Sequence, residues 1–123
     1  MLFDSNIIIY SIQPKHDFLV EFILKNNCVV SEVSIAEVLG FHKITSIEKL
    51  SLRQIFNEIK ILDLNRIIIE AATVLRQQKS MSLGDSLIAG TALVHQIPLV
   101  TRNTDDFLHI EGLKIINPFE KSL

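Results

Sequence analysis

The sequence is poor in the residues that build disulfide-bonded, membrane-spanning or repetitive proteins. It has one cysteine, Cys28, so no disulfide can form within the chain, and a reducing cytoplasm is the expected compartment. It has no tryptophan, four glycines and three prolines, and we find no repeat or linker-like segment. No apolar run approaches the roughly 18 residues of a membrane helix, and no basic stretch of the secretory type precedes the first apolar residues.

Neither sign of charge dominates the chain. Twelve lysine and arginine residues against 14 aspartate and glutamate residues give a net charge of −2, which argues against a large basic surface for nucleic acid. This balance does not exclude an enzyme that acts on nucleic acid, because bound cations supply positive charge locally. With 123 residues, of which 48% are hydrophobic and 21% charged, the sequence predicts one globular domain over residues 1–123.

Short apolar runs alternate with segments of helical period along the chain. We expect strands at 1–4, 28–31, 59–62, 98–101 and 114–116. We expect helices at 5–12, 16–26, 33–42, 46–57, 65–79, 83–95 and 104–108. The expected strands are short and apolar, as strands buried on both faces tend to be. The alternation therefore predicts a three-layer α/β/α fold, in which helices cover both faces of a parallel sheet of four or five strands.

Four acidic or amide residues lie far apart in the sequence, yet each falls where an expected strand ends or a helix begins. They are Asp4, Glu37, Asp85 and Asn103. In a parallel sheet such points share the carboxyl edge, where ligands bind. Two bare carboxylates about 4 Å apart repel by up to ~4 kcal/mol at an effective dielectric constant of 20. A bound Mg²⁺ or Mn²⁺ offsets this repulsion, and oxygen-only ligands suit these ions. The pattern therefore predicts a site for a hard divalent cation.

Helix capping is the simpler explanation for each of these residues alone. The pairs Ser34–Glu37 and Ser82–Asp85 both fit the capping pattern Ser-x-x-Glu/Asp, and Asp4 directly precedes an expected helix. Capping does not require the residues to share one edge of the sheet, so their convergence in space distinguishes the two explanations. The four histidines are scattered, so we expect them on the surface or in the core rather than around zinc.

Four sequence blocks, in this order, resemble the PIN domain family and, within it, the VapC-type toxins of bacterial or archaeal toxin–antitoxin pairs. The blocks are Leu2-Phe3-Asp4-Ser5-Asn6, Ser34-Ile35-Ala36-Glu37-Val38, the run from Leu83 to Ala92, and the run from Leu99 to Phe107. The resemblance covers almost the whole chain. It implies a metal-dependent ribonuclease with the α/β fold expected above, which commonly forms homodimers and whose site an antitoxin protein typically blocks.

The resemblance also implies roles for individual residues. By motif match, Asp4, Glu37 and Asp85 are the expected ligands of one or two Mg²⁺ or Mn²⁺ ions. The family's fourth acidic position falls on Asn103, and Asp106, three residues later, is the alternative.

Five further residues are candidates for supporting roles. Side chains that would orient a carboxylate or a metal-bound water are Ser5, Asn6 and Thr101; in the alternative explanation Asn6 is an ordinary first-turn helix residue and Thr101 an ordinary strand residue. Side chains that would meet RNA phosphates are Arg102 and Lys43, for which the alternative is solvated surface charge.

Two other functions are compatible with the same residues. In the first, the neutral Asn103 weakens metal binding, and the fold serves as a binding module without turnover. In the second, Phe3-Asp4-Ser5-Asn6 resembles the Asp-x-Asp opening of haloacid-dehalogenase-like phosphatases, in which the first aspartate is a phosphorylated nucleophile. Asn6 replaces the second aspartate of that motif, and no matching lysine motif follows.

Overall fold

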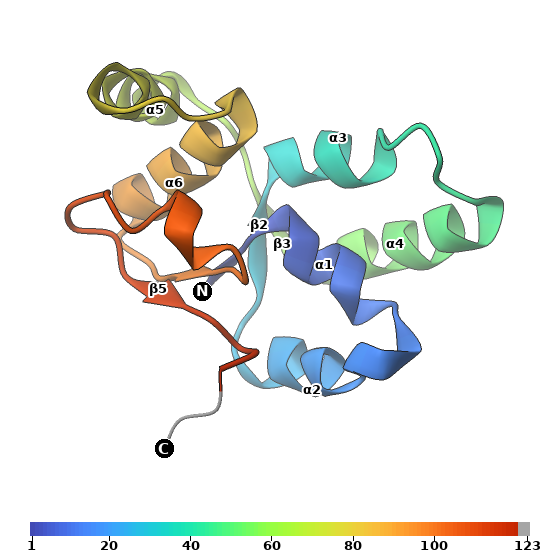
Figure 1. The fold of residues 1–123 in the computed structure, drawn as a ribbon. Helices are drawn as coiled ribbons and strands as arrows, with labels where there is room; N and C mark the ends of the chain where they lie inside the picture. Colours follow the sequence, from blue (N-terminus) through green and yellow to red (C-terminus); the bar gives the residue numbers. More distant parts are fainter. Residues whose placement is uncertain (121–123) are drawn as a thin grey trace.

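Five parallel strands form one sheet in the order β3-β2-β1-β4-β5 (Figure 1). The structure is a computed structural model that describes residues 1–120. The strands are β1 (Leu2–Phe3), β2 (Val29–Ser31), β3 (Lys60–Leu62), β4 (Leu99–Val100) and β5 (Ile115–Ile116). The predicted parallel sheet is confirmed, and every strand is one or two residues shorter than predicted.

Strand β1 lies at the centre of the sheet. Its residue Leu2 pairs with Val29 of β2 on one side and with Leu99 of β4 on the other. The chain first adds β2 and β3 on one side of β1 and later adds β4 and β5 on the other. Where the strand order reverses in this way, a crevice opens outside the carboxyl ends of the two diverging strands. Asp4 follows β1 and Thr101 follows β4, so both residues lie at this crevice.

The described residues also form six α-helices and two short 3₁₀ turns. They are α1 (Ser5–Ser11), η1 (Pro14–His16), α2 (Phe18–Lys25), α3 (Glu32–Leu39), α4 (Ser46–Glu58), α5 (Arg66–Gln78), α6 (Leu83–His95) and η2 (Thr104–Asp106). None of these helices within residues 1–120 is long and apolar enough to cross a bilayer.

Three predicted helices need correction. The helix predicted at 33–42 ends at Leu39, and Gly40 is its C-cap. The helix predicted at 16–26 begins only at Phe18, because the 3₁₀ turn η1 occupies the residues before it. The helix predicted at 104–108 is the single 3₁₀ turn η2, in which the N–H of Asp106 bonds to the carbonyl of Asn103. The chain leaves this turn at Phe107, which is fully buried in the core, so the turn does not extend into a helix.

The helices form two layers, one on each face of the sheet. Figure 1 shows α1 to α4 on one side and α5 and α6 on the other. Neighbouring residues of a strand point to opposite faces, and β1 follows this rule: Phe3 joins a core with Ile7 of α1 and Phe56 of α4, whereas Leu2 joins a second core with Ile88 of α6. The predicted three-layer α/β/α arrangement is therefore confirmed.

Candidate active site

Three carboxylates that are distant in sequence line one open cavity at the carboxyl edge of the sheet. Asp4 reaches this cavity from the end of β1, Glu37 from α3, and Asp85 from the first turn of α6. The cavity has a volume of about 420 Å³, and Ser5, Asn6, Ile9 and Phe41 complete its lining. Helix capping does not require these three acids to line the same cavity, so the arrangement favours a common function for them.

Asp4 is buried, and its side chain does not cap the helix that follows it. Its exposed fraction is 5%, and it occupies the N-cap position of α1 without any capping hydrogen bond from its side chain. Instead the hydroxyl of Thr101 donates to Asp4 Oδ2 at 2.8 Å, and the main-chain N–H of Asn103 donates to Thr101 Oγ1 at 3.1 Å. The end of β4 therefore holds the Asp4 carboxylate in place across the crevice.

Glu37 is held by two serines rather than by a helix terminus. The helix α3 has its N-cap at Ser31, which accepts from the N–H of Val33, so the cap expected at Ser34–Glu37 is wrong. Ser5 Oγ lies 2.7 Å from Glu37 Oε1 and 2.8 Å from Ser34 Oγ. A hydroxyl carries one proton and an ionised carboxylate only accepts. Ser5 therefore donates its hydroxyl proton to Glu37, and the Ser34 hydroxyl donates to the oxygen of Ser5.

The main chain of Asp85 takes part in a helix cap, and its side chain lines the acidic cavity. Ser82 caps α6 by accepting from the main-chain N–H of Asp85 at 3.1 Å, as the capping pattern predicts. This cap uses the main chain, while the Asp85 side chain lines the cavity with Asp4 and Glu37. Asp85 also lines a second cavity of about 210 Å³, together with Asp106 and His109. Asp85 therefore lies between the main acidic cavity and the turn η2.

Burial and the charges of neighbouring acids raise the pKa of Asp4 and of Asp85. Burial is the main cause of the rise in the pKa of Asp4 from 3.8 to about 6, and the charges of Asp85 and Glu37 add to it; the Thr101 hydroxyl and the Ser5 N–H act in the opposite direction. Burial also raises the pKa of Asp85, with further contributions from the charges of Asp106 and Glu37, while a hydrogen bond to Ser82 lowers it. The site therefore accumulates negative charge that nearby side chains do not neutralise.

The donor set suits a hard cation but does not form a closed cage. Within residues 1–120, no three Asp, Glu, His or Cys side chains lie close enough together to hold a metal ion as they stand. Mg²⁺ usually keeps several waters and is bound through only one or two carboxylates, so it does not require a closed cage. The buried Asp4, with its pKa raised to about 6, is the side chain that gains most from a neighbouring cation. Asp4, Asp85 and Glu37 thus fit such an ion.

The remaining predicted site residues differ in how close they lie to the cavity. Asn103 is exposed and contributes its main-chain N–H to the site. Asp106 is close enough to Asp85 to raise its pKa. Lys43 is exposed in the loop between α3 and α4, two residues after the cavity residue Phe41. Arg102 stacks on aromatic rings instead of lining the acidic cavity.

Three residues of the site were not found from the sequence. Ser34 belongs to the hydroxyl chain that holds Glu37. At Gly84 a Cβ atom would clash with Glu37 Oε2, so glycine makes room for that carboxylate. His109 has both ring nitrogens buried without a hydrogen-bond partner among the described residues. For Gly84, the Leu-Gly-Asp block gave a signal, but only the packing of α6 against α3 shows what it faces.

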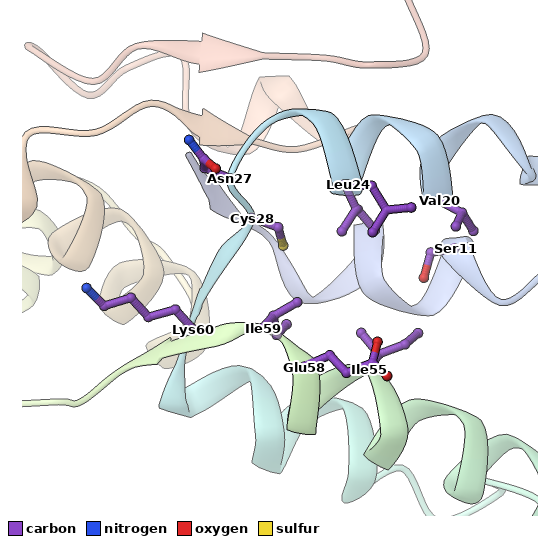
Figure 2. Close-up of a pocket in the computed structure, with 10 residues that line it drawn as sticks. Ser11, Val20, Leu24, Asn27, Cys28, Ile55, Glu58, Ile59 and Lys60 are labelled. Atoms are coloured by element: carbon purple, nitrogen blue, oxygen red, sulfur yellow. The ribbon is translucent and has the colours of Figure 1, made fainter.

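A separate cavity of about 370 Å³ lies at the opposite, amino edge of the sheet (Figure 2). Its lining comes from α2, from Cys28 just before β2, and from Ile59 and Lys60 where β3 begins. Glu58 is the only acidic residue in this lining. Burial raises the pKa of the Cys28 thiol to about 12, so Cys28 is a thiol at neutral pH and a poor nucleophile. The acidic cavity is therefore the better candidate for a reaction.

An acidic cavity at the switch point of a parallel sheet defines a class of α/β protein with a site suited to metal-assisted chemistry. The sequence model of the PIN domain family matches residues 1–113. The chain belongs to the PIN domain family, and its resemblance to PIN domains of the VapC type is confirmed. PIN domains of VapC toxins are nucleases.

Solved structures agree with this assignment. A toxin–antitoxin complex from Klebsiella pneumoniae matches with a TM-score of 0.78 at 27% identity, over 98% of each chain. VapBC2 from Rickettsia felis, bound to a DNA fragment from its promoter, matches with a TM-score of 0.79 at 26% identity, over 94% of this chain and 96% of that chain. DNA-bound VapBC from Salmonella typhimurium shares the fold, with a TM-score of 0.78 at 21% identity. No curated protein sequence matches the chain.

Proposed function

We propose that this chain is a metal-dependent endoribonuclease that hydrolyses RNA phosphodiester bonds and acts as the toxin of a toxin–antitoxin pair. The observation that carries the proposal is the convergence of Asp4, Glu37 and Asp85 on one cavity at the β1–β4 crevice. The raised pKa of the buried Asp4 also supports the proposal, because it means that ionised Asp4 is unfavourable here unless a cation lies close to it. Membership of a nuclease family favours this function over the phosphatase alternative.

In this proposal each residue has a defined task. Asp4, Asp85 and Glu37 hold one or two Mg²⁺ or Mn²⁺ ions, directly or through water. A bound ion of this kind polarises a phosphate oxygen and lowers the pKa of a water molecule. Thr101 orients the Asp4 carboxylate, and Ser5 orients the Glu37 carboxylate.

The residues around the acids complete the assignment. Asn6, which lines the cavity, is the polar group available to position a water or a phosphate oxygen there. Asn103 or Asp106 provides the fourth position, and Asp106 is close enough for its charge to raise the pKa of Asp85. Arg102 and Lys43 are the proposed cationic contacts to the RNA backbone.

The assembly in which the chain acts is part of the proposal. Structures similar to this chain include toxin–antitoxin complexes, which supports an antitoxin protein as a partner. A homodimer is supported by apolar side chains that α5 leaves exposed: Ile67 is 66% exposed, and Ile69 and Val74 are each 49% exposed. Sedimentation of the chain alone and with its antitoxin tests both interactions, and a monomer at all concentrations would exclude the homodimer.

The test of the reaction is RNA cleavage in Mg²⁺ or Mn²⁺ by the wild-type chain and by matched charge variants. We expect Asp4→Asn and Asp85→Asn to abolish cleavage while the proteins remain folded. The control is Asp63→Asn, which removes an exposed aspartate just after β3 and should cleave like the wild type. Undiminished cleavage by folded Asp4→Asn and Asp85→Asn proteins would exclude the assignment.

A binding module without turnover remains the second candidate. It is favoured by one observation, that no three acids within residues 1–120 form a closed metal cage. The two candidates differ in metal binding, because an ion that binds the folded chain must stabilise it by mass action. A melting temperature unchanged by millimolar Mn²⁺, together with absent cleavage, would favour the binding module.

A further inference from the structure

The side chain of Arg102, just beyond β4, stacks on two aromatic rings. Its Cζ atom lies 4.1 Å from the centre of the Phe119 ring and 5.3 Å from the centre of the Tyr10 ring. Both distances lie within the range of about 6 Å for a cation–π interaction. Among residues 1–120, Arg102 has no acidic partner at ion-pair distance. The rings therefore fix a planar cation that forms no ion pair with the carboxylates of residues 1–120.

The two rings are part of a larger aromatic cluster at the surface. The ring centre of Phe119 lies 5.5 Å from that of Tyr10, 5.1 Å from that of His16 and 5.2 Å from that of Phe18, each in an edge-to-face arrangement. Phe18, the first residue of α2, is 44% exposed. The cluster thus presents an apolar ring to solvent beside a stacked guanidinium group.

Two cations lie beside this cluster. The pKa of His16 is lowered by desolvation and then by the positive charges of Lys15 and Arg102, which places both cations near the His16 ring. Lys15 is exposed, and it makes no ion pair among the described residues. The exposed acids Asp17 and Glu120 are the sequence neighbours of His16 and Phe119, and neither forms an ion pair with Lys15 or Arg102.

The cluster continues directly from the acidic cavity. Tyr10 follows Asn6 by one turn on the same face of α1, about 6 Å along the helix axis, and Asn6 lines the acidic cavity. Arg102 follows Thr101, whose hydroxyl bonds to Asp4. When a phosphate of an RNA strand lies in the acidic cavity, the neighbouring nucleotide of that RNA is therefore within reach of the cluster.

Internal packing explains only part of this arrangement. Tyr10 and Phe119 pack against the core beneath α1, so their rings help to hold the segment after β5. Packing requires neither the exposed Phe18 ring nor a guanidinium group stacked on two rings, as that of Arg102 is. Both are the features of sites that bind single-stranded nucleic acid, where cations meet the backbone and aromatic rings stack on bases.

We propose that this surface binds an unpaired nucleotide of the RNA strand next to the scissile phosphate. We call it the Arg102 platform, and it consists of Tyr10, Lys15, His16, Phe18, Arg102 and Phe119. Arg102 and Lys15 bind a backbone phosphate, and the base stacks on the exposed ring of Phe18. A base can lie on a protein ring only when it is not stacked in a duplex, so the surface binds a nucleotide that is unpaired. The inference rests on the proposed nuclease function and adds the residues that bind the nucleotide beside the scissile phosphate.

The composition of the chain provides a probe that reports on this surface alone. The sequence has one tyrosine and no tryptophan, so intrinsic fluorescence comes from Tyr10. The test ligand is a short single-stranded RNA with 2′-O-methyl groups at every position, which binds without being cleaved. We expect this RNA to quench Tyr10 emission, and the same sequence as a duplex to quench it far less.

Substitutions separate the roles of the ring and of the cation. Phe18→Ala should weaken binding by about fivefold or more, as loss of one stacked base does, and leave its salt dependence unchanged. Arg102→Gln should lower the slope of log affinity against log salt by about 0.7, the value for one phosphate contact to a single strand. Arg102→Lys keeps the charge and should retain that slope while binding more weakly, because it loses the stacked planar fork.

Matched controls come from the opposite edge of the sheet. Leu24, on the same helix as Phe18, is 78% exposed and lines the amino-edge cavity of Figure 2, so Leu24→Ala should bind RNA like the wild type. Lys114, just before β5, is exposed, so Lys114→Gln controls for Lys15→Gln. Far-ultraviolet circular dichroism establishes that each variant is folded.

The outcomes distinguish the platform from the nuclease function. Unchanged affinity in Phe18→Ala and Arg102→Gln, in a chain that still cleaves RNA with an unaltered KM, would overturn the platform and leave the nuclease standing. Raised KM in both variants with kcat retained would support the platform. If the wild type does not cleave RNA in Mn²⁺, the nuclease function fails, and with it the place of the platform beside a scissile phosphate, whatever Tyr10 reports.

Discussion

The buried carboxylate of Asp4 makes a quantitative prediction about stability in the absence of metal. Its pKa rises from 3.8 to about 6 in the folded chain, so the folded state binds the Asp4 proton more tightly than the unfolded state. Ionisation of Asp4 therefore destabilises the fold. Each tenfold change in proton affinity corresponds to about 1.4 kcal/mol, so the full effect on the free energy of unfolding is about 3 kcal/mol.

The sign of the pH dependence follows from the direction of this shift. Below pH 3.8 Asp4 is protonated in both states and adds no destabilisation. As the pH rises from 3.8 to about 6, only the unfolded chain releases the proton readily, so the free energy of unfolding falls. Above pH 7 the destabilisation is complete. This contribution runs opposite to that of a salt-bridged aspartate, which is lost on acidification.

The variant that tests this reasoning is Asp4→Asn, which cannot ionise and still offers an oxygen to the Thr101 hydroxyl. In chelator at pH 7.5 we expect it to be more stable than the wild type by about 2–3 kcal/mol, less than the full effect because the buried amide needs a new partner. That difference corresponds to roughly 10 °C in melting temperature. Near pH 4 the two proteins should be about equally stable.

Urea unfolding followed by far-ultraviolet circular dichroism gives the free energy at each pH. The control Asp63→Asn, which removes an exposed aspartate, should match the wild type at both pH values. Added Mn²⁺ should stabilise the wild type and leave Asp4→Asn almost unchanged. The reasoning fails if Asp4→Asn is no more stable than the wild type at pH 7.5, or if its advantage persists undiminished at pH 4.

Four further predictions concern other parts of the site and the core. Gly84→Ala places a methyl group against Glu37 Oε2, so the carboxylate must move; we expect RNA cleavage to fall by about 100-fold with little change in melting temperature, and unchanged cleavage would count against a role for Glu37. Gly90→Ala instead meets the Ile68 carbonyl at 3.1 Å, so it should lower the melting temperature while activity per folded molecule is kept. Thr101→Val removes the hydroxyl that bonds to Asp4; pH titrations should show the pKa of Asp4 raised further, and cleavage reduced by about 10–100-fold. Cys28, buried and with its pKa raised to about 12, should react with thiol reagents at pH 8 only as fast as the chain opens, and rapid labelling of the native protein would contradict this.

The fold could be predicted well from the sequence because its signals are local. Apolar runs such as Cys28–Ser31 and the helical period of residues 65–79 require only neighbouring residues, and the structure has a strand at Val29–Ser31 and a helix at Arg66–Gln78. Where prediction failed, tertiary context decided. The segment 104–108 forms a single turn because Phe107 is buried in the core, and α3 begins at Glu32 because Ser31, the last residue of β2, caps it.

The amino-acid sequence by itself determined which chemical groups this protein has available and on which edge of a parallel sheet they would lie. The strand-end positions of Asp4 and Thr101 follow from hydrophobic patterning, because a buried strand must end where polar residues begin. Only the tertiary structure decided which groups touch: Ser5 with Glu37, Gly84 against the same carboxylate, and Arg102 on the rings of Tyr10 and Phe119. These contacts join residues far apart in the chain, and their geometry depends on helix packing across the sheet, which no local pattern encodes.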